Sequence, residues 1–295
     1  MKAVRFHEYG GPDVLRYEDV EVPVPGAGQV RLRVAATTFN GVDANIRGGF
    51  MQGPIPVELP HTPGIDVAGT VETLGDGVDG LAVGDRVIGF LPMAGVGAAA
   101  EYVIAPAEVL TAAPTTIPLA DAAALPAVGL TARQALFEHA KLTAGQRILI
   151  NGAGGAVGRY AVQMAGSAGA HVIAKGSPRS TAATEEPIEP VDVVLNLAPV
   201  EPAQLAALVT LIRDGGTLVN TTVWMPAPSD DKRGVTGINM FVRSDARELA
   251  QLVAQVDAGQ LRVDIAERVP LAELPALHAR AAAGELPSGK IIFTL

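Results

Sequence analysis

The chain has 295 residues, a length that accommodates two domains, each large enough to bury its own core. Hydrophobic residues make up 48% of it and charged residues 18%, which is typical of a folded globular protein rather than a disordered or fibrous one. The net charge of -9 argues against a general affinity for nucleic acid or anionic membranes. Because there is no cysteine, disulfides, cysteine-ligated zinc and thiol nucleophiles are excluded.

The first residues, MKAVRFHEYGGP, alternate apolar and polar side chains and lack the long apolar core of a signal peptide. No segment is continuously apolar for the length that a bilayer requires. We therefore expect a cytoplasmic protein that has neither a membrane nor a nucleic acid as its partner.

Short alternating runs, cut by glycine and proline, fill residues 1–112. They are MKAVRF, QVRLRVAATTF, DVAGTVETLG, DRVIGF and AEYVIA. A period of two between turn residues predicts the strands of an antiparallel, barrel-like domain. Over residues 118–140 the period becomes helical, and internal proline and glycine predict two helices there.

From residue 147 onward, apolar runs alternate with amphipathic stretches. The predicted order is a strand at 147–151, a glycine-rich loop, a helix at 156–168, strands at 171–174 and 191–198, a helix at 202–213 and a strand at 216–223. Buried strands separated by helices predict an α/β domain with a doubly wound parallel sheet. The tail predicts a helix ending at residue 258, a strand at 262–269, a helix at 271–283 and a last strand at 290–295.

The loop after residue 151 fails the strict Gly-x-Gly-x-x-Gly pattern but fits Gly-x-x-Gly-x-x-Gly, with Gly152, Gly155 and Gly158 evenly spaced. The first glycine suits a tight turn, the second a close approach of backbone amides to a pyrophosphate, and the third close packing of the helix on the sheet. An anion would lie at the helix N-terminus, where Ala156 and Val157 follow. Glycines alone also occur in plain turns, but the strand before and the helix after favour dinucleotide binding.

The end of the second strand predicts which dinucleotide is bound. An NAD site normally has Asp or Glu there, whereas this chain has AKGSPRS, which offers Lys175, Ser177 and Arg179. Cationic and hydroxyl side chains suit a ribose 2′-phosphate, so we expect NADPH. The alternative is that Lys175 and Arg179 are solvated surface charges.

Taken together, these stretches resemble the medium-chain dehydrogenase/reductase superfamily, in its zinc-free quinone oxidoreductase (zeta-crystallin-like) branch. The resemblance extends almost from end to end through YGGPDVL, VPVPGAGQVRLRV, NGVDANIRGG, PGIDVAGTVETLG, VGDRVIGF, AAALPAVGLTARQAL, the glycine loop and VPLAEL with GELPSGKIIF. It implies an α/β protein with a GroES-like β-rich catalytic domain and a Rossmann domain. The expected divisions are 1–112 for the catalytic domain, 113–243 for the Rossmann NADP(H)-binding domain, and 244–295 for a return to the catalytic domain.

The same resemblance implies that catalytic zinc is absent. Zinc-dependent members of the superfamily bind the metal through Cys and His in segments where this chain has Asn40 and Ile65. The histidines have no ligand spacing and are expected to be surface or packing residues: His7, His61, His139, His171 and His278. Without a Lewis acid, reduction of a quinone or another conjugated carbonyl is favoured, because conjugation spreads the incoming charge.

Site residues follow from the resemblance position by position. It implies Asn40 and Thr131 as catalytic-site residues beside the nicotinamide, with the remaining cofactor contacts at Asn196, Leu197, Phe241, Val242 and Lys290. Asn40 could equally be a turn residue that bonds its own backbone, and Thr131 a helix N-cap. Asp43 and Asp66 are conceivable acids, although structural pairing with Arg47 and the neighbouring turns is favoured.

The sequence departs from the family in two places. Many relatives have a tyrosine where this chain has Asn45, which puts a tyrosine donor in doubt. Only GSPRSTAATEEPIEP separates the second Rossmann strand from the strand at 191–198, which is too short for the usual helix and strand. We therefore expect a shortened sheet edge and an open adenosine pocket.

The favoured function is NADPH-dependent, zinc-independent reduction of a small conjugated carbonyl, such as a quinone. Two alternatives stay open: an enoyl reductase of a biosynthetic pathway, and a protein that binds NADPH without useful turnover. Relatives often dimerise through Rossmann sheet edges, so we expect a homodimer, with GVTGINMFV as a candidate contact strand.

Overall fold

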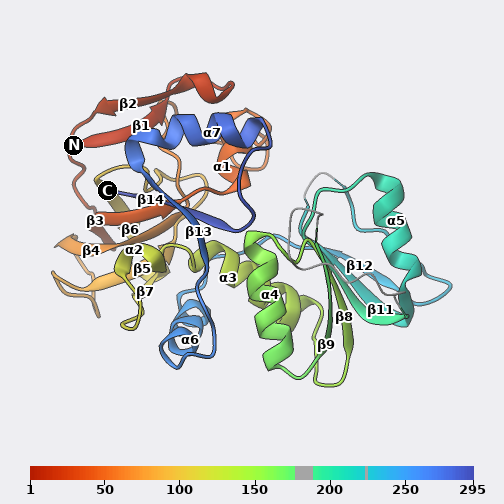
Figure 1. Ribbon diagram of the computed structural model, residues 1–295. Helices are drawn as coiled ribbons and strands as arrows, with labels where there is room; N and C mark the ends of the chain where they lie inside the picture. Colours follow the sequence, from red (N-terminus) through yellow and green to blue (C-terminus); the bar gives the residue numbers. More distant parts are fainter. Residues whose placement is uncertain (177–188, 223–224) are drawn as a thin grey trace. The chain divides into compact units, whose positions relative to one another are not determined.

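The computed structural model describes residues 1–176, 189–222 and 225–295 (Figure 1). The chain divides into two units, of which the first contains residues 1–127, 244–259 and 263–295, and the second contains 128–243 and 260–262. The first unit therefore includes both ends of the chain and resumes at residue 244. The segment that ends at Ala127 is tied to this unit by a hydrogen bond from Ala127 N to Asp66 Oδ1.

The first unit is built around a seven-stranded sheet in the order β13-β14-β3-β4-β5-β7, with β6 also pairing with β3. Its strands are antiparallel except for the pair β13 and β14. A separate antiparallel pair is formed by β1 and β2. The strand bounds are β1 Lys2–Phe6, β2 Leu15–Asp19, β3 Gln29–Thr38, β4 Asp66–Leu74, β5 Arg86–Phe90, β6 Tyr102–Pro106, β7 Leu110–Ala112, β13 Ile265–Pro270 and β14 Lys290–Thr294.

Helices of the first unit fill in around this sheet. They are α1 Gly41–Arg47, α2 Leu119–Ala122, the start of α3 Pro126–Arg133, α6 Ala246–Asp257 and α7 Leu274–Ala282. Helix α6 begins where the Asp245 side chain accepts hydrogen bonds from the backbone N–H groups of Arg247 and Glu248.

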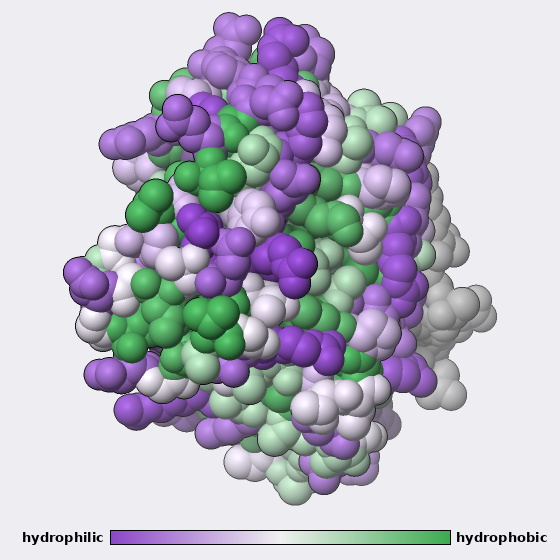
Figure 2. Space-filling view, turned by 90° about the vertical axis from the view of Figure 1, so that its left-hand side faces the viewer, coloured by the Kyte–Doolittle hydropathy of each residue, from purple (hydrophilic) through white to green (hydrophobic). Residues whose placement is uncertain are grey.

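The face in Figure 2 mixes hydrophilic side chains with several separate hydrophobic patches, as is ordinary for a water-exposed surface.

The second unit contains a five-stranded parallel sheet in the order β12-β11-β10-β8-β9. Its elements are β8 Arg147–Asn151, α4 Ala156–Ser167, β9 His171–Lys175, β10 Val191–Asn196, α5 Pro202–Thr210, β11 Ile212–Asn220 and β12 Thr236–Asn239, with a π-helical turn at Gln134–His139 after α3. The crossover from β8 to β9 runs toward the β9 edge of the sheet, whereas the crossover from β10 to β11 runs toward the β12 edge. Right-handed crossovers therefore put α4 and α5 on opposite faces, as Figure 1 shows.

Both parts of the predicted α/β fold are present: one unit contains a doubly wound parallel sheet, and the other is rich in antiparallel strands. Within the described part of the chain, β9 pairs with β8 alone, so it forms a sheet edge where a shortened edge was predicted. No helix among the described residues is long and apolar enough to cross a membrane.

Several element boundaries differ from the predictions. The helix predicted at 202–213 ends at Thr210, because Ile212 already pairs with Val191 in the sheet and is fully buried. Strands β2 and β7 were not predicted, since β2 is rich in charged residues and β7 has only three residues. The last two predicted helices are confirmed as α6 and α7 with shorter bounds.

Candidate functional site

The glycine loop joins β8 to α4 in the second unit. Gly152 has φ +92°, a left-handed conformation that favours glycine, and its N–H donates to Lys175 O at 2.8 Å. A Cβ added to Gly158 would lie 2.6 Å from Ala153 Cα and would also collide with Gly152 O. Gly158 thus lets the first turn of α4 approach the backbone of the loop, whereas the sequence had suggested close approach to the sheet.

The N-terminus of α4 fits an anionic group. Gly155 is the N-cap and makes no side-chain capping bond, and Ala156 and Val157 are the first two helical residues. This helix has 12 residues and no acidic side chain in its first turn, so its dipole favours a negative charge there. The loop and helix therefore fit the diphosphate of a dinucleotide.

The residues expected to select the cofactor lie just beyond this loop. Lys175 ends β9, is exposed, and lies opposite Asn151 in the register of the sheet. Ser177 and Arg179 lie outside the described residues. The preference for a 2′-phosphate stays a prediction.

The other cofactor residues expected in the second unit lie at or after the carboxyl ends of its strands. Asn196 ends β10, and Leu197 N donates to Asn151 O at 2.9 Å. The Asn196 amide is fully buried and bonds to neighbouring side chains. Phe241 and Val242 follow β12, and Phe241 lines a cavity of about 210 Å³. Their contacts to a cofactor stay predictions.

Thr131 lies within α3, in the part that belongs to the second unit. The helix begins five residues earlier in the sequence, at Pro126, so the alternative that Thr131 is a helix N-cap is wrong. The Thr131 side chain is half-buried, and its predicted place beside a nicotinamide carboxamide stays a prediction.

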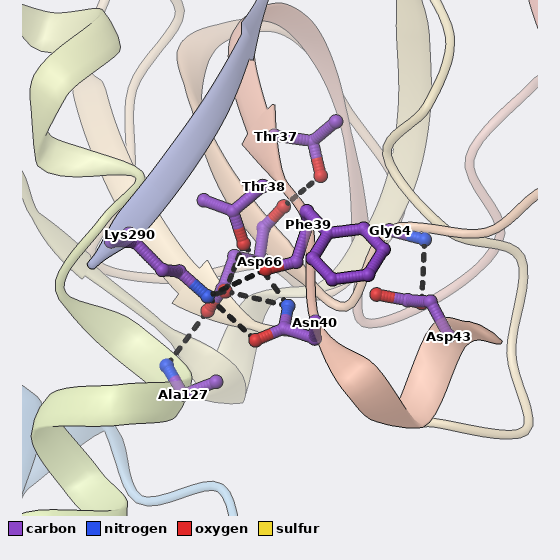
Figure 3. A network of polar contacts seen from close by, with 9 residues as sticks. All are labelled: Thr37, Thr38, Phe39, Asn40, Asp43, Gly64, Asp66, Ala127 and Lys290. Atoms are coloured by element: carbon purple, nitrogen blue, oxygen red, sulfur yellow. Dashed lines mark hydrogen bonds and ion pairs between the residues drawn. The ribbon is translucent and has the colours of Figure 1, made fainter. Parts of the chain in front are cut away.

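A buried polar network lies in the first unit, between β3, β4, α1 and β14 (Figure 3). The Lys290 ammonium donates to Asp66 Oδ2 at 3.0 Å, to Asn40 Oδ1 at 2.6 Å and to Phe39 O at 3.3 Å. Lys290 is 2% exposed and Asp66 0%, so each charge depends on the other for compensation. We call these three side chains, Lys290, Asp66 and Asn40, the lysine triad.

Asn40 is oriented by the triad rather than by its own turn. It precedes α1 as the N-cap, but its side chain makes no capping bond. The Nδ2 group instead donates to Asp66 Oδ2 and to Thr38 Oγ1, each at 3.0 Å. The alternative of a turn residue bonded to its own backbone is therefore wrong. Both Nδ2 hydrogens are used, whereas Oδ1 can accept one more hydrogen bond.

The Asp66 carboxylate is held by backbone as well as side chains. Its Oδ1 accepts from Ala127 N at 2.7 Å, and its Oδ2 accepts from Thr38 Oγ1 at 2.5 Å. Its backbone O accepts from Thr37 Oγ1 at 2.7 Å, which fixes the start of β4 against β3. Five donors thus converge on one residue, because Lys290 and Asn40 also donate to Oδ2.

Asp43 lies beside this network on α1 and is buried. Its Oδ1 accepts from Gly64 N at 2.9 Å, and its Oδ2 has no hydrogen-bond partner in the described structure. Burial raises the pKa of Asp43 to about 7, and the charge of Asp66 adds to the rise. The expected pairing with Arg47 is wrong, because Arg47 donates to Gly10 O and His278 Nδ1. Asp43 is instead paired with the backbone of the turn at Gly64.

Lys290 was expected to contact the cofactor. Its three donor positions are directed at Asp66, Asn40 and Phe39, so its geometry supports holding the Asn40 amide. A cofactor contact by Lys290 stays a prediction. The triad itself was missed from the sequence, where Asp66 and Lys290 lie 224 positions apart.

Comparison with known proteins gives two matches to family models. Residues 26–115 match the alcohol dehydrogenase GroES-like domain. Residues 168–292 match a family described as zinc-binding dehydrogenase.

Curated relatives include the chloroplastic quinone-oxidoreductase homolog of Spinacia oleracea, 39% identical over 186 residues, which are 61% of this chain and 56% of that protein. The chain thus spans little more than half the length of the first relatives it matches. Quinone oxidoreductase of Lama guanicoe is 30% identical over 330 aligned positions that cover 100% of this chain and 98% of that protein.

Solved structures of similar proteins match this chain over its whole length. The quinone oxidoreductase from Coxiella burnetii is 27% identical with a TM-score of 0.90, covering 100% of this chain and 99% of that one. A mycobacterial protein complexed with NADPH is 25% identical with a TM-score of 0.85, covering 100% of both chains.

The residues present do not fit the zinc ion that one family description implies. The sequence has no cysteine, and among the described residues no group of three or more His, Asp or Glu side chains could hold a metal ion. The oxygens of Asn40 and Asp66 already face the Lys290 ammonium, which would repel a second cation. Burial lowers the pKa of His61 to about 4 and that of His278 to about 3, with Arg47 contributing at His278, so both rings are neutral near pH 7. His278 is nevertheless engaged, because its Nδ1 accepts a hydrogen bond from Arg47.

Proposed function

Because the chain belongs to the medium-chain dehydrogenase/reductase superfamily, in its quinone oxidoreductase branch, we propose that it is an NADPH-dependent, metal-independent reductase of conjugated carbonyls such as quinones. The observation that carries the proposal is the lysine triad. Its ammonium already bonds to the side-chain oxygens of Asn40 and Asp66, so these oxygens are not available as ligands of a metal ion. A conjugated acceptor suits such a site because it spreads the incoming charge without a Lewis acid.

The second unit supports cofactor binding. The glycine loop and the uncapped start of α4 would hold the diphosphate, and Lys175 lies at the next strand end, where a cation favours a ribose 2′-phosphate. When bound, NADPH supplies the hydride. Ser177 and Arg179 are proposed to assist Lys175. Leu197, Val242 and Thr131 are proposed to lie near the nicotinamide riboside.

The first unit supplies a fixed hydrogen-bond acceptor. Because both donors of the Asn40 amide are used by Thr38 and Asp66, Asn40 does not serve as a proton donor. Its Oδ1 keeps one lone pair beside the Lys290 bond and is proposed to accept from a donor of the bound cofactor. The triad thereby orients one group and leaves the proton on the reduced acceptor to come from solvent.

The direct test is NADPH oxidation with a simple quinone, compared with NADH and repeated in the presence of a chelator. We expect faster turnover with NADPH and no effect of the chelator. Equal use of NADH, or loss of activity on chelation, would contradict the proposal. Activity confined to enones or enoyl thioesters would indicate an enoyl reductase, and tight NADPH binding without turnover would indicate a binding protein.

A matched pair of variants tests the role of the triad. Asn40→Ala removes the oriented amide and should lower kcat/KM by about fivefold or more, since one well-placed hydrogen bond contributes about 1 kcal/mol or more. Gln29→Ala removes an amide of the same unit that accepts from Gly26 N in an exposed turn, and it should leave activity unchanged. Equal activities of the two variants would refute a role for Asn40.

The assembly and location of the chain are proposed as a cytoplasmic homodimer. Among the described residues, β12 pairs with β11 alone, which leaves an edge that a second copy could extend. Gel filtration with light scattering decides between a monomer and a dimer.

A further inference from the structure

Four of the six asparagines of the chain form a row across the sheet of the second unit. Each is the last residue of its strand: Asn151 of β8, Asn196 of β10, Asn220 of β11 and Asn239 of β12. The register pairs Asn151 with Asn196, Asn196 with Asn220, and Asn220 with Asn239. We call this row the asparagine ladder. It lies at the carboxyl edge of a parallel sheet, where ligands bind in such folds.

The side-chain amides of the ladder are hydrogen-bonded in one direction. Asn151 Nδ2 donates to Asn196 Oδ1 at 2.7 Å, and Asn196 Nδ2 donates to Asn220 Oδ1 at 2.9 Å. The last link, from Asn220 Nδ2 to Asn239 Oδ1, is longer, at 3.4 Å. Asn196 is 0% exposed and Asn220 1%, so the middle of this row of uncharged amides is buried. Successive bonds of this kind polarise one another.

Asn220 also fixes the chain that follows β11. Its Oδ1 accepts from Thr222 Oγ1 at 2.8 Å and from Thr222 N at 3.3 Å. Its Nδ2 donates to Thr222 O at 3.0 Å and to Met225 O at 2.9 Å. One buried amide therefore holds both Thr222 and Met225 in place.

These same residues surround a cavity of about 210 Å³, a volume that suits a single ring rather than a large ligand. Its lining is Asn220, Thr222, Met225, Pro226, Asn239, Met240 and Phe241. Asn239 is exposed, and its Oδ1 also accepts from Ala227 N at 2.9 Å. Within the described part of the chain its Nδ2 has no partner, so a donor is open at the cavity.

The other end of the ladder adjoins the glycine loop. Asn151 is followed directly by Gly152, whose N–H bonds to Lys175 O. The ladder thus spans the sheet edge from the proposed diphosphate site to the cavity. An uncharged ring that carries a carbonyl group matches the open amide donor and the methionine and phenylalanine side chains around it.

We propose that the asparagine ladder positions the nicotinamide end of the bound dinucleotide, with Asn220 and Asn239 as positioning residues. The proposal rests on the NADPH binding proposed above. Asn239 Nδ2 donates to the carboxamide oxygen. Asn220 fixes the cavity-lining residues Thr222 and Met225 and donates to Asn239 Oδ1. Asn196 acts through Asn220, since it does not line the cavity.

The test compares two ligands that differ only in the nicotinamide end: NADPH and 2′-phospho-ADP-ribose. Calorimetric titration of Asn220→Ala should show NADPH affinity lowered about tenfold, while affinity for 2′-phospho-ADP-ribose stays within about twofold. Asn239→Ala changes an exposed position and leaves the buried hydrogen bonds of the ladder intact. It should likewise lower the affinity for NADPH but not that for 2′-phospho-ADP-ribose, and it tests the proposal if Asn220→Ala does not fold. Gln204→Ala, which removes an exposed capping amide of α5, should change neither affinity.

Equal weakening of both ligands in Asn239→Ala would indicate a general disturbance of the sheet and overturn the proposal, as would unchanged NADPH affinity. If the wild-type chain binds neither ligand, the proposed function itself fails. If the wild-type chain binds both ligands but the variants show no split, only the ladder proposal fails.

Discussion

Removal of the Lys290 ammonium tests the lysine triad as a structural element. In Lys290→Met the stem of the side chain is kept, but Asp66, which is 0% exposed, loses its only charged partner within the described structure. Uncompensated burial of one charge costs about 3–5 kcal/mol. We expect the free energy of unfolding to fall by about that amount.

The matched control is Arg268→Met in the same unit. Arg268 also pairs with an aspartate, Asp121 at 2.7 Å, but its side chain is 54% exposed, so its loss should cost less than about 1 kcal/mol. Urea unfolding followed by circular dichroism measures both variants. The double variant Lys290→Met/Asp66→Asn, which also removes the stranded charge, should be more stable than Lys290→Met alone. Equal losses in Lys290→Met and Arg268→Met would refute the reasoning.

Three further predictions concern Asp43, the glycine loop and the cofactor phosphate. Because the pKa of Asp43 is raised in the folded state, its protonated carboxyl stabilises the fold at low pH, and this contribution is lost as pH rises. Between about pH 4 and pH 7, the free energy of unfolding of wild type should fall by up to about 1.4 kcal/mol per pH unit relative to that of Asp43→Asn, as measured by urea unfolding. Parallel curves would contradict this. Gly158→Ala should cost about 1–3 kcal/mol and weaken NADPH binding, because its Cβ meets loop backbone, whereas Gly166→Ala in the same helix meets nothing within 4 Å and should be neutral or stabilising in thermal unfolding. Lys175→Ala should narrow the ratio of kcat/KM for NADPH over NADH, and an unchanged ratio would exclude Lys175 from 2′-phosphate binding.

The sequence predicted best those features that depend on neighbouring residues. The glycine loop is one, because the positions of Gly152, Gly155 and Gly158 follow from a strand, a turn and a helix within a dozen residues. The parallel sheet and the antiparallel strands other than β2 and β7 were also predicted, since their apolar periods differ. The end of α5 was not, because Ile212 belongs to a strand by its burial in the sheet, whereas its neighbours continue the helical pattern.

The sequence predicted less of the candidate site, because its contacts join distant segments. Nothing local distinguishes Lys290 as the partner of Asp66, and the two meet only when β14 pairs with β3 beside β4. The asparagine ladder did leave a signal, because three of its members end apolar runs, at Asn151, Asn196 and Asn220. One polar residue after a strand is common in turns, so only the register of β8, β10, β11 and β12 shows that the four are neighbours.

The most direct test of the proposed function is a single-turnover experiment in which the chain, in excess over NADPH and with a chelator present, is mixed with a quinone. The proposal predicts rapid loss of the reduced nicotinamide absorbance, at a rate that Asn40→Ala lowers and Gln29→Ala does not. Stable binding of NADPH without oxidation by any quinone would contradict it.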